Sequence, residues 1–279
     1  MFLVRYSIPF LKRLILKPLM LKHLILKILL ITMSSIMMTT SYASNESLNS
    51  ITLAVEDNWP PYADSYGQGI STNIVRAAFA SVGIELSLHV APYARVLYQV
   101  KKGIVIGGYN VTRQASREQQ FLFGKEVLLH AQAFFYFPPN SEEAKSYKNI
   151  ADIPDGASVG IIIDYEYGDI FDKHKHRFKL VEVSQQKQII SMLTLGRLDA
   201  AIMFEAVAQH TLESMHLSTN EIQKGPLNHR SNIHIAFSKF HQHSQYFADK
   251  LDQGLMNIKQ SGLYYKLLKY ESGNVVSKY

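Results

Sequence analysis

Two arginines lie four residues apart in the segment NVTRQASREQQFLF, residues 110–123. The segment follows a glycine pair and ends on Phe-Leu-Phe, so fixed positive charge is placed near the end of a predicted buried strand. A guanidinium group presents a planar fork of N–H donors that matches the two oxygens of a carboxylate. Arg117 is therefore a candidate for binding a carboxylate, and the alternative is an ordinary surface arginine. Arg113 is expected to face water unless a ligand carries a second acid.

Aromatic residues lie near the predicted ends of the first strands. Trp59, the single tryptophan, and Tyr62 follow strand 51–56, and Tyr93 begins a helix after the next strand. In open α/β sheets, ligands bind beyond the carboxyl ends of the strands. Aromatic faces there could sandwich a ligand or hold an ammonium group by cation–π attraction. The alternative is packing in the apolar core, which is the usual role of large aromatic side chains.

Two glycine motifs resemble chemical signatures but lack their context. GASVG, residues 156–160, fits the Gly-x-Ser-x-Gly pattern of a nucleophilic serine. That motif requires a strand before the serine and a helix after it, whereas a turn precedes Ser158 and a strand follows, so no hydrolase is predicted. The glycine pair 107–108 lacks the spacing of a phosphate-binding loop. It is expected to let the backbone come close to a ligand or to a neighbouring helix.

The sequence offers little that would bind a metal or a cofactor. The pairs His174/His176 and His241/His243 lie in polar stretches with no third ligand close in sequence, so no metal site is predicted. Cysteine is absent, which excludes disulfides, thiolate ligands, a cysteine nucleophile and a lipid-modified cysteine. No cofactor is expected.

The apolar pattern predicts two α/β units that must position these residues. In the first unit we expect strands at 51–56, 84–90 and 104–109, and helices at 70–83 and 93–103. After a turn-rich segment we expect strands at 158–163, 178–183 and 198–203, and helices at 167–174, 184–196 and 205–215. Ser184 is the expected cap of helix 184–196, and Gly196 its stop. Such alternation is typical of parallel sheets covered by helices.

Two extended segments, 131–137 and 232–238, flank the second unit, and two amphipathic helices close the chain. The predicted fold class is therefore α/β with two lobes, in which the second lobe is inserted in the first and two strands cross between them. The predicted boundaries are 44–133 and 232–279 for lobe 1 and 134–231 for lobe 2. A two-strand crossing is a natural hinge, because few residues must change conformation for the lobes to close.

Residues 1–43 have the pattern of a secretory signal. Positive residues come first, an apolar stretch from Ile25 to Met38 follows, and small residues precede a cleavage site after Ala43. The leader is long, so we predict that translation starts at Met20. A retained membrane anchor is the alternative, but the apolar run after Lys27 is shorter than the ~20 residues that span a bilayer. Export of a chain without cysteine or later apolar spans predicts a periplasmic protein.

The basic character of the chain is confined to this leader. The formal net charge is +6, but six of the 29 Lys and Arg residues lie in residues 1–43, which contain no acid. The 23 basic residues that follow balance the 23 Asp and Glu residues. Nucleic-acid binding therefore has no electrostatic support.

Four stretches, by their order and spacing, resemble the bacterial extracellular solute-binding proteins of family 3, typified by polar amino acid receptors of ABC transporters. They are AVEDNWPPY (54–62) with GQGISTNIV (67–75), YNVTRQASREQQFLF (109–123), LGRLDAAI (195–202) and SGLYYKLLKY (261–270). The resemblance covers about the whole chain after the leader. It implies a two-lobed type II periplasmic-binding-protein fold.

The resemblance also implies roles for individual residues. Arg117, six residues before Phe123, matches the family arginine that pairs with the ligand's carboxylate. Thr112, five residues earlier, matches the hydroxyl that helps to orient the same group. The aromatic residues that match ligand-stacking positions, or lie beside one, are Trp59, Tyr93 and Tyr62.

The second lobe departs from the family pattern. The family aspartate that takes the ligand's ammonium lies five residues after the position of Asp199, and Phe204 stands there in this chain. Glu205 could substitute if the turn rotates. The family's small turn is replaced by Asp-Tyr-Glu at 164–166, so a ligand without a standard ammonium, or an aromatic one, is an alternative to an α-amino acid. Tyr165, Glu166 and Glu205 are candidates for the second lobe's side of the cleft. Glu56 is a candidate acid on the first lobe.

We expect a periplasmic solute-binding protein that captures a small carboxylate-bearing solute, an amino acid or a related organic acid, by hinge closure. It would deliver this solute to an inner-membrane ABC permease, act as a monomer and catalyse no reaction. One alternative is a periplasmic dehydratase of the cyclohexadienyl type, with Glu166 or Glu205 as general acid. The other is a ligand sensor that docks on a signalling receptor.

Overall fold

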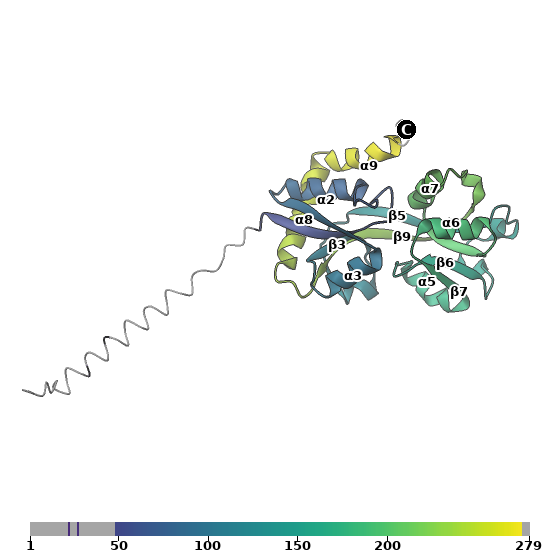
Figure 1. Ribbon diagram of the computed structural model, residues 1–279, viewed down its shortest axis with the longest axis horizontal. Helices are drawn as coiled ribbons and strands as arrows, with labels where there is room; N and C mark the ends of the chain where they lie inside the picture. The colour runs from purple at the N-terminus through teal and green to yellow at the C-terminus, as the bar shows by residue number, and fades with distance from the viewer. Residues whose placement is uncertain (1–21, 23–26, 28–47, 275–279) are drawn as a thin grey trace, which may run out of the picture. The chain divides into compact units, whose positions relative to one another are not determined.

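The computed structural model describes Lys22, Lys27 and residues 48–274 (Figure 1). Apart from the two lysines, the predicted leader over residues 1–43 lies outside the described residues, as do its cleavage site and the predicted start at Met20. Among the described residues, no helix is both long enough and apolar enough to cross a bilayer.

Nine strands of the described chain form one mixed sheet in the order β2-β1-β3-β9-β5-β8-β6-β7, with β4 paired to β9. Their bounds are β1 Ser50–Glu56, β2 Glu85–Ala91, β3 Gly107–Thr112, β4 Phe121–Phe123, β5 Leu129–Phe137, β6 Ser158–Ile162, β7 Lys179–Val183, β8 Ala200–Phe204 and β9 Gln223–Ser238. β1 pairs in parallel with β2 and β3, and β6 with β7 and β8. The strands β5 and β9 run antiparallel to each other between these two parallel units.

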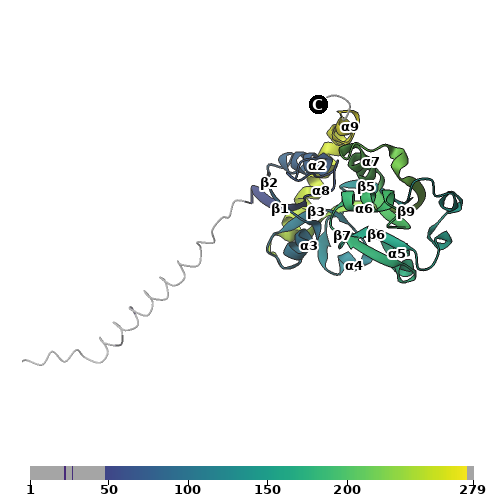
Figure 2. The same cartoon turned by 45° about the vertical axis from the view of Figure 1, so that its right-hand side comes forward.

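Helices accompany each parallel unit (Figures 1 and 2). We call β1–β4 with their helices the first lobe, and β6–β8 with theirs the second lobe. The first lobe contains α2 Ile70–Ala80, α3 Tyr93–Lys101, α4 Ala115–Glu118, α8 Ser244–Gln260 and α9 Leu263–Asn274. The second contains α5 Gly168–His174, α6 Gln186–Thr194 and α7 Glu205–Ser214. The predicted two-lobed α/β class, with the second lobe inserted between two crossing strands, is confirmed.

Apolar burial ties the crossing strands to both lobes. One cluster of buried residues includes Leu53 of the first lobe, Phe135 of β5 and Phe171 of the second lobe. Along the β5–β9 ladder the register shifts between Ala133 and Phe134 and again between Phe134 and Tyr136. Such irregularities bend a strand pair locally. The predicted lobe boundaries, between residues 133 and 134 and between residues 231 and 232, lie inside these strands and remain predictions.

Three of the differences between the predicted and the observed elements have a clear structural cause. The third strand is β3, later than the predicted 104–109, because the N–H groups of Ile104 and Val105 donate to the carbonyl of Gln99 and hold these residues at the end of α3. Helix α6 is capped by Gln185 in a capping box with Gln188, so the expected cap at Ser184 is wrong by one residue. Strand β9 begins well before the predicted 232, because its polar first half pairs with β5.

The glycine pair at 107–108 lies beneath helix α3. A Cβ atom on Gly108 would lie 2.5 Å from Cγ1 of Val96 and 3.3 Å from the carbonyl oxygen of Ala54. Of the two predicted reasons for these glycines, the structure therefore supports close approach of a neighbouring helix. This packing fixes the N-terminus of α3, where Tyr93 lies.

Candidate functional site

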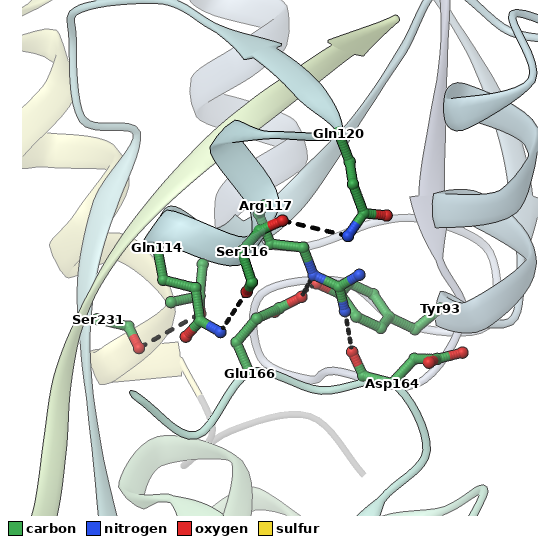
Figure 3. Close-up of polar contacts among 9 residues, drawn as sticks. Tyr93, Gln114, Ser116, Arg117, Gln120, Asp164, Glu166 and Ser231 are labelled. Carbon is green, nitrogen blue, oxygen red and sulfur yellow. Dashed lines mark hydrogen bonds and ion pairs between the residues drawn. The ribbon is translucent and has the colours of Figure 1, made fainter. Parts of the chain in front are cut away.

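Arg117 lies at the end of the short helix α4 and reaches from the first lobe to the second (Figure 3). Its Nε donates to the carboxylate of Glu166, and its Nη2 donates to the backbone carbonyl of Asp164 at 2.7 Å. The Arg117 side chain is 15% exposed and that of Glu166 is 4% exposed. The candidate carboxylate-binding arginine therefore lies at the contact between the lobes and already holds a carboxylate there.

Glu166 belongs to the turn that follows β6, in the second lobe. Its second oxygen accepts a hydrogen bond from the Tyr93 hydroxyl at 2.7 Å. Asp164 in the same turn has a φ of 63°, a left-handed conformation that asparagine and aspartate tolerate better than most residues. Burial raises the pKa of Glu166, and the positive charge of Arg117 and the hydroxyl of Tyr93 counter that rise. The turn thus delivers a buried carboxylate to two groups of the first lobe.

The neighbouring residue of this turn makes a second contact across the lobes. The Tyr165 hydroxyl donates to the carboxylate of Glu56, at the end of β1, and its ring meets that of Tyr93 edge to face at 4.8 Å between centroids. Glu56 is 2% exposed. Its burial raises its pKa well above the ordinary value, although the Tyr165 hydrogen bond acts in the opposite direction. The cluster therefore holds two buried carboxyl groups and one guanidinium.

The raised pKa of Glu56 predicts a measurable dependence of stability on pH. Above the ordinary glutamate pKa of 4.5 the unfolded chain has lost this proton while the folded chain keeps it, so the free energy of unfolding falls as pH rises toward the raised pKa. We expect Glu56→Gln, which stays neutral, to lose less stability than the wild type between pH 5 and pH 8. Urea unfolding at both pH values measures this, and an identical pH dependence in the two proteins would contradict it.

The aromatic candidates form a second contact between the lobes. Trp59 is 1% exposed, and its ring lies 4.2 Å from that of Tyr62 and meets Phe204 of the second lobe edge to face at 5.2 Å. The Trp59 indole N–H has no hydrogen-bond partner among the described residues. Burial raises the pKa of Tyr62 to about 12, and the charge of Glu205 adds to that rise. These rings lie between the lobes rather than within the core of one lobe.

Two of the predicted residues lie apart from this cluster. The Thr112 hydroxyl donates to the hydroxyl of Ser231 at 3.3 Å, and among the described residues it makes no hydrogen bond with Arg117. Glu205 begins α7, is about half exposed, and pairs with Lys224. The structure thus brings together Arg117, Glu166, Tyr93, Tyr165 and Glu56. It places Trp59 against both Tyr62 and Phe204, and leaves Thr112 and Glu205 outside these contacts.

Arg113 is the surface arginine of the pair. Its side chain is 37% exposed, and its Nε pairs with Glu118 at 2.6 Å. Its Nη1 donates to the carbonyl of Gly124 at 3.1 Å. The two arginines of the opening segment therefore have different environments, which makes Arg113 a suitable control for experiments on Arg117.

Asn110 is a polar residue of this region that the sequence analysis does not predict. It lies in β3 at an irregularity in the pairing with β9, with a φ of 70° and 4% exposure. Its amide is close enough to Glu56 to lower the pKa of that group slightly, yet neither amide atom makes a hydrogen bond of normal geometry among the described residues. Asparagine is uncommon inside strands, which is the signal that could have identified it. A buried amide without a partner could serve a bound polar ligand.

Other candidate sites lie away from the cluster. Within residues 48–274, no group of three His, Cys, Asp or Glu side chains is arranged to hold a metal ion. A cavity of about 420 Å³ opens in the second lobe, lined among others by Phe137, Tyr147 and Asp199. None of its lining residues belongs to the cluster around Arg117.

Comparison with known proteins agrees with this architecture. The family described as bacterial extracellular solute-binding proteins, family 3, matches residues 51–271. No curated protein sequence matches the chain significantly.

Three solved structures share the fold at low identity. An amino acid ABC transporter substrate-binding protein, AbpA from Streptococcus pneumoniae Canada MDR_19A bound to L-arginine, is 20% identical, with a TM-score of 0.67 over 84% of this chain and 98% of the other. A histidine kinase sensor domain with similarity to periplasmic binding proteins is 15% identical, with a TM-score of 0.69 over 80% and 96%. An ancestral arginine-binding protein bound to arginine is 17% identical, with a TM-score of 0.67 over 80% and 97%.

Proposed function

This chain belongs to the bacterial extracellular solute-binding proteins, family 3, and we propose that it captures a small carboxylate-bearing solute between its lobes. The observation that carries the proposal is Arg117, a mostly buried guanidinium at the contact between the lobes whose donors already hold a carboxylate. Amino acids and related organic acids offer the same group. The rings of Trp59, Tyr62 and Tyr93 would enclose the rest of the solute.

Closure would strengthen this binding. When the lobes meet around a solute, water leaves the site, and an ion pair to Arg117 gains strength in the lower dielectric. We expect an affinity of about micromolar, which corresponds to a binding free energy of roughly 8 kcal/mol. Closure also creates a surface that a membrane partner can distinguish from the open form. We propose that the mature protein acts as a monomer in the periplasm and delivers its solute to an ABC permease.

Arg117→Ala tests this function directly. We expect the solute that most stabilises the wild type in a thermal-shift panel of amino acids, dicarboxylates and aromatic acids to bind the variant about 100-fold more weakly or worse, because a buried charge pair is lost. Arg113→Ala, the matched control, should bind within about threefold of the wild type, because this arginine forms an exposed pair. Trp59 fluorescence provides an independent titration, since the single indole is enclosed at the contact between the lobes.

Two outcomes would contradict the proposed role of Arg117. If the solute stabilises Arg117→Ala as much as it stabilises the wild type, Arg117 does not bind the carboxylate and the proposed site is wrong. A loss of binding in Arg113→Ala as large as that in Arg117→Ala would equally contradict the assignment. The unliganded melting temperature of each variant shows whether it is folded.

A sensing role is the second candidate, because the histidine kinase sensor domain shares this fold over most of its length. In that case the liganded protein would dock on a signalling receptor instead of a permease. Pull-down of the liganded mature protein with membranes, followed by identification of the captured partner, separates the two. An ABC permease supports delivery, and a histidine kinase supports sensing.

A further inference from the structure

We propose that the cavity of the second lobe is a separate binding site for a small organic cation, an ammonium group that carries apolar substituents. The cavity measures about 420 Å³, within the range of about 300–1,000 Å³ that is usual for ligand pockets. Its lining comes from the end of β5, from the connection between β5 and β6, and from the residue that precedes β8. It is therefore large enough for a small molecule and is built mainly from one connecting segment.

Two aromatic rings form a corner of this cavity. Phe137, the last residue of β5, is 2% exposed, and its ring lies 5.6 Å from that of Tyr147 with 61° between the ring planes. Strand β9 comes close to the Phe137 ring, since a Cβ atom on Gly225 would lie 2.3 Å from its Cε2 atom. Ile153 and Ala157 add apolar surface. Such a corner can attract a cation through the ring faces and cover its alkyl groups.

The charged groups of the cavity are all acidic. The described residues that line it include Glu143, Asp155 and Asp199, and none of them is Lys, Arg or His. Asp155 is paired with Arg177, whose Nε lies 2.5 Å from its Oδ1. Glu143 and Asp199 have no ion-pair partner within the described part of the chain. Two carboxylates therefore remain to balance a positive charge inside the cavity.

Asp199 presents one of these charges in a fixed orientation. The backbone N–H and the hydroxyl of Ser158 both donate to its Oδ2 at 2.7 Å, and its own N–H donates to the Ser158 hydroxyl at 2.9 Å. These hydrogen bonds lower the pKa of Asp199 against the effect of partial burial, and the charge of Lys179 lowers it further. The carboxylate is therefore ionised at neutral pH, and its Oδ1 is left for a cation.

Glu143 places the second charge beside the aromatic corner. It begins the 3₁₀ helix Glu143–Ser146, one turn before Tyr147. Burial raises the pKa of Tyr147, and the charge of Glu143 adds to that rise, so the carboxylate and the phenol ring are close. An ammonium group against this ring would lie within reach of an opposite charge.

The segment that carries the acidic wall is held in place from outside the cavity. The Nη2 of Arg177 donates to the carbonyl of Ile153 at 2.8 Å, and its Nη1 donates to that of Ile150 at 3.3 Å. The side chain of Asn149 caps the 3₁₀ helix Ile150–Asp152 by accepting from the N–H of Ala151 at 2.8 Å. A wall fixed in this way needs little ordering when a ligand binds, which favours affinity.

The arrangement of the acids favours an organic cation over a metal ion. Within residues 48–274, the carboxylates of this cavity do not belong to any group of three ligands that could hold a metal. A divalent ion requires several oxygens that converge on one point. An ammonium with alkyl substituents instead spreads its charge over a larger volume, which suits separated carboxylates and aromatic faces.

This site is distinct from the contact between the lobes. Ala157 and Asp199 immediately precede β6 and β8, whereas Glu166 follows the opposite end of β6. The two sites therefore lie at opposite ends of the parallel strands of the second lobe. We expect the cation to bind whether or not Arg117 is present.

Choline and 3,3-dimethyl-1-butanol test the proposal, because they have the same shape and differ in that a carbon replaces the quaternary nitrogen. In NMR titrations with the mature protein, we expect choline to bind about tenfold more tightly than the alcohol. Equal affinities would show that the cavity does not recognise charge. No binding of choline at about 10 mM would likewise overturn the proposal.

Two variants of the lining and one matched control locate the site. Glu143→Gln removes one charge, and Tyr147→Leu removes a ring while keeping an apolar side chain; each should weaken choline about fivefold or more and change the alcohol less. Glu142→Gln is the control, since Glu142 is exposed, pairs with Lys145 and does not line the cavity. It should bind choline within about twofold of the wild type. An equal loss in the control, or no loss in either lining variant, would overturn the assignment. Melting temperatures show whether each variant is folded.

Arg117→Ala separates this inference from the proposed function. It should keep choline binding within about twofold of the wild type even where it loses the carboxylate-bearing solute. Loss of choline binding in a folded Arg117→Ala protein would place choline between the lobes and overturn the second site. Failure of choline to bind the wild type would leave the proposed role of Arg117 intact.

Discussion

Replacing Gly254 with alanine is expected to lower the free energy of unfolding by about 2 kcal/mol or more. Gly254 lies in α8 where this helix crosses α2, and a Cβ atom there would lie 2.6 Å from the carbonyl carbon of Ala78 and closer still to its oxygen. Backbone atoms cannot rotate away, so the two helices must separate. Alanine gains about 1 kcal/mol over glycine in helix propensity, and this gain is too small to offset the overlap.

Gln253→Ala is the matched control for this prediction, since it introduces the same residue one position earlier, on the exposed face of α8. It should change the free energy of unfolding by about 0.5 kcal/mol or less. Urea unfolding of the two variants and the wild type measures both effects. A Gly254→Ala protein as stable as the wild type would show that α2 and α8 do not pack as closely as described.

Replacing Phe135 with alanine is expected to cost about 3–5 kcal/mol of stability. Phe135 is fully buried in β5, where it pairs with Ile202 of β8 and belongs to the apolar cluster that includes residues of both lobes. Removing the ring leaves a cavity that the surrounding strands can fill only in part. Because β5 is one of the two crossing strands, this loss should weaken both lobes together.

Phe134→Ala provides an internal comparison for that prediction. Phe134 points to the opposite face of β5, is only partly buried, and lies beneath the Lys224 ammonium, which is 3.7 Å from the ring centroid. We expect its removal to cost about 2 kcal/mol or less. Equal losses for the two variants in urea unfolding would contradict the assignment of the buried face of β5.

Local patterns predict most of the fold. The alternation of apolar residues locates β1 and β2, and the helical spacing locates α2, because burial on one face leaves a periodic signature in the sequence. The first half of β9 has no such signature, since its polar residues are fixed by pairing with β5, which is distant in the chain. β3 begins late because the end of α3 retains residues that are apolar enough for a strand.

The candidate site is less predictable than the fold. The spacing of Arg117 identifies a group that reaches the contact between the lobes, and the aromatic residues follow from their place after the first strand. The partner of Arg117 does not follow from the sequence, because Glu166 lies 49 residues away and only the tertiary fold brings it there. The exposure of Glu205, likewise, depends on the direction in which α7 leaves β8 and on its partner Lys224.

The pairing of β5 with β9 has a consequence for the way the molecule opens. Both strands pass between the lobes while bonded to each other, from Phe137 opposite Gln223 to Leu129 opposite Ile233. If one of the two strands rotated without the other, the hydrogen bonds between them would break. A bend that both strands share, at the register shifts near Phe134, would preserve these hydrogen bonds. We therefore expect a single rotational coordinate, along which the salt bridge and the aromatic contact across the lobes are released in concert.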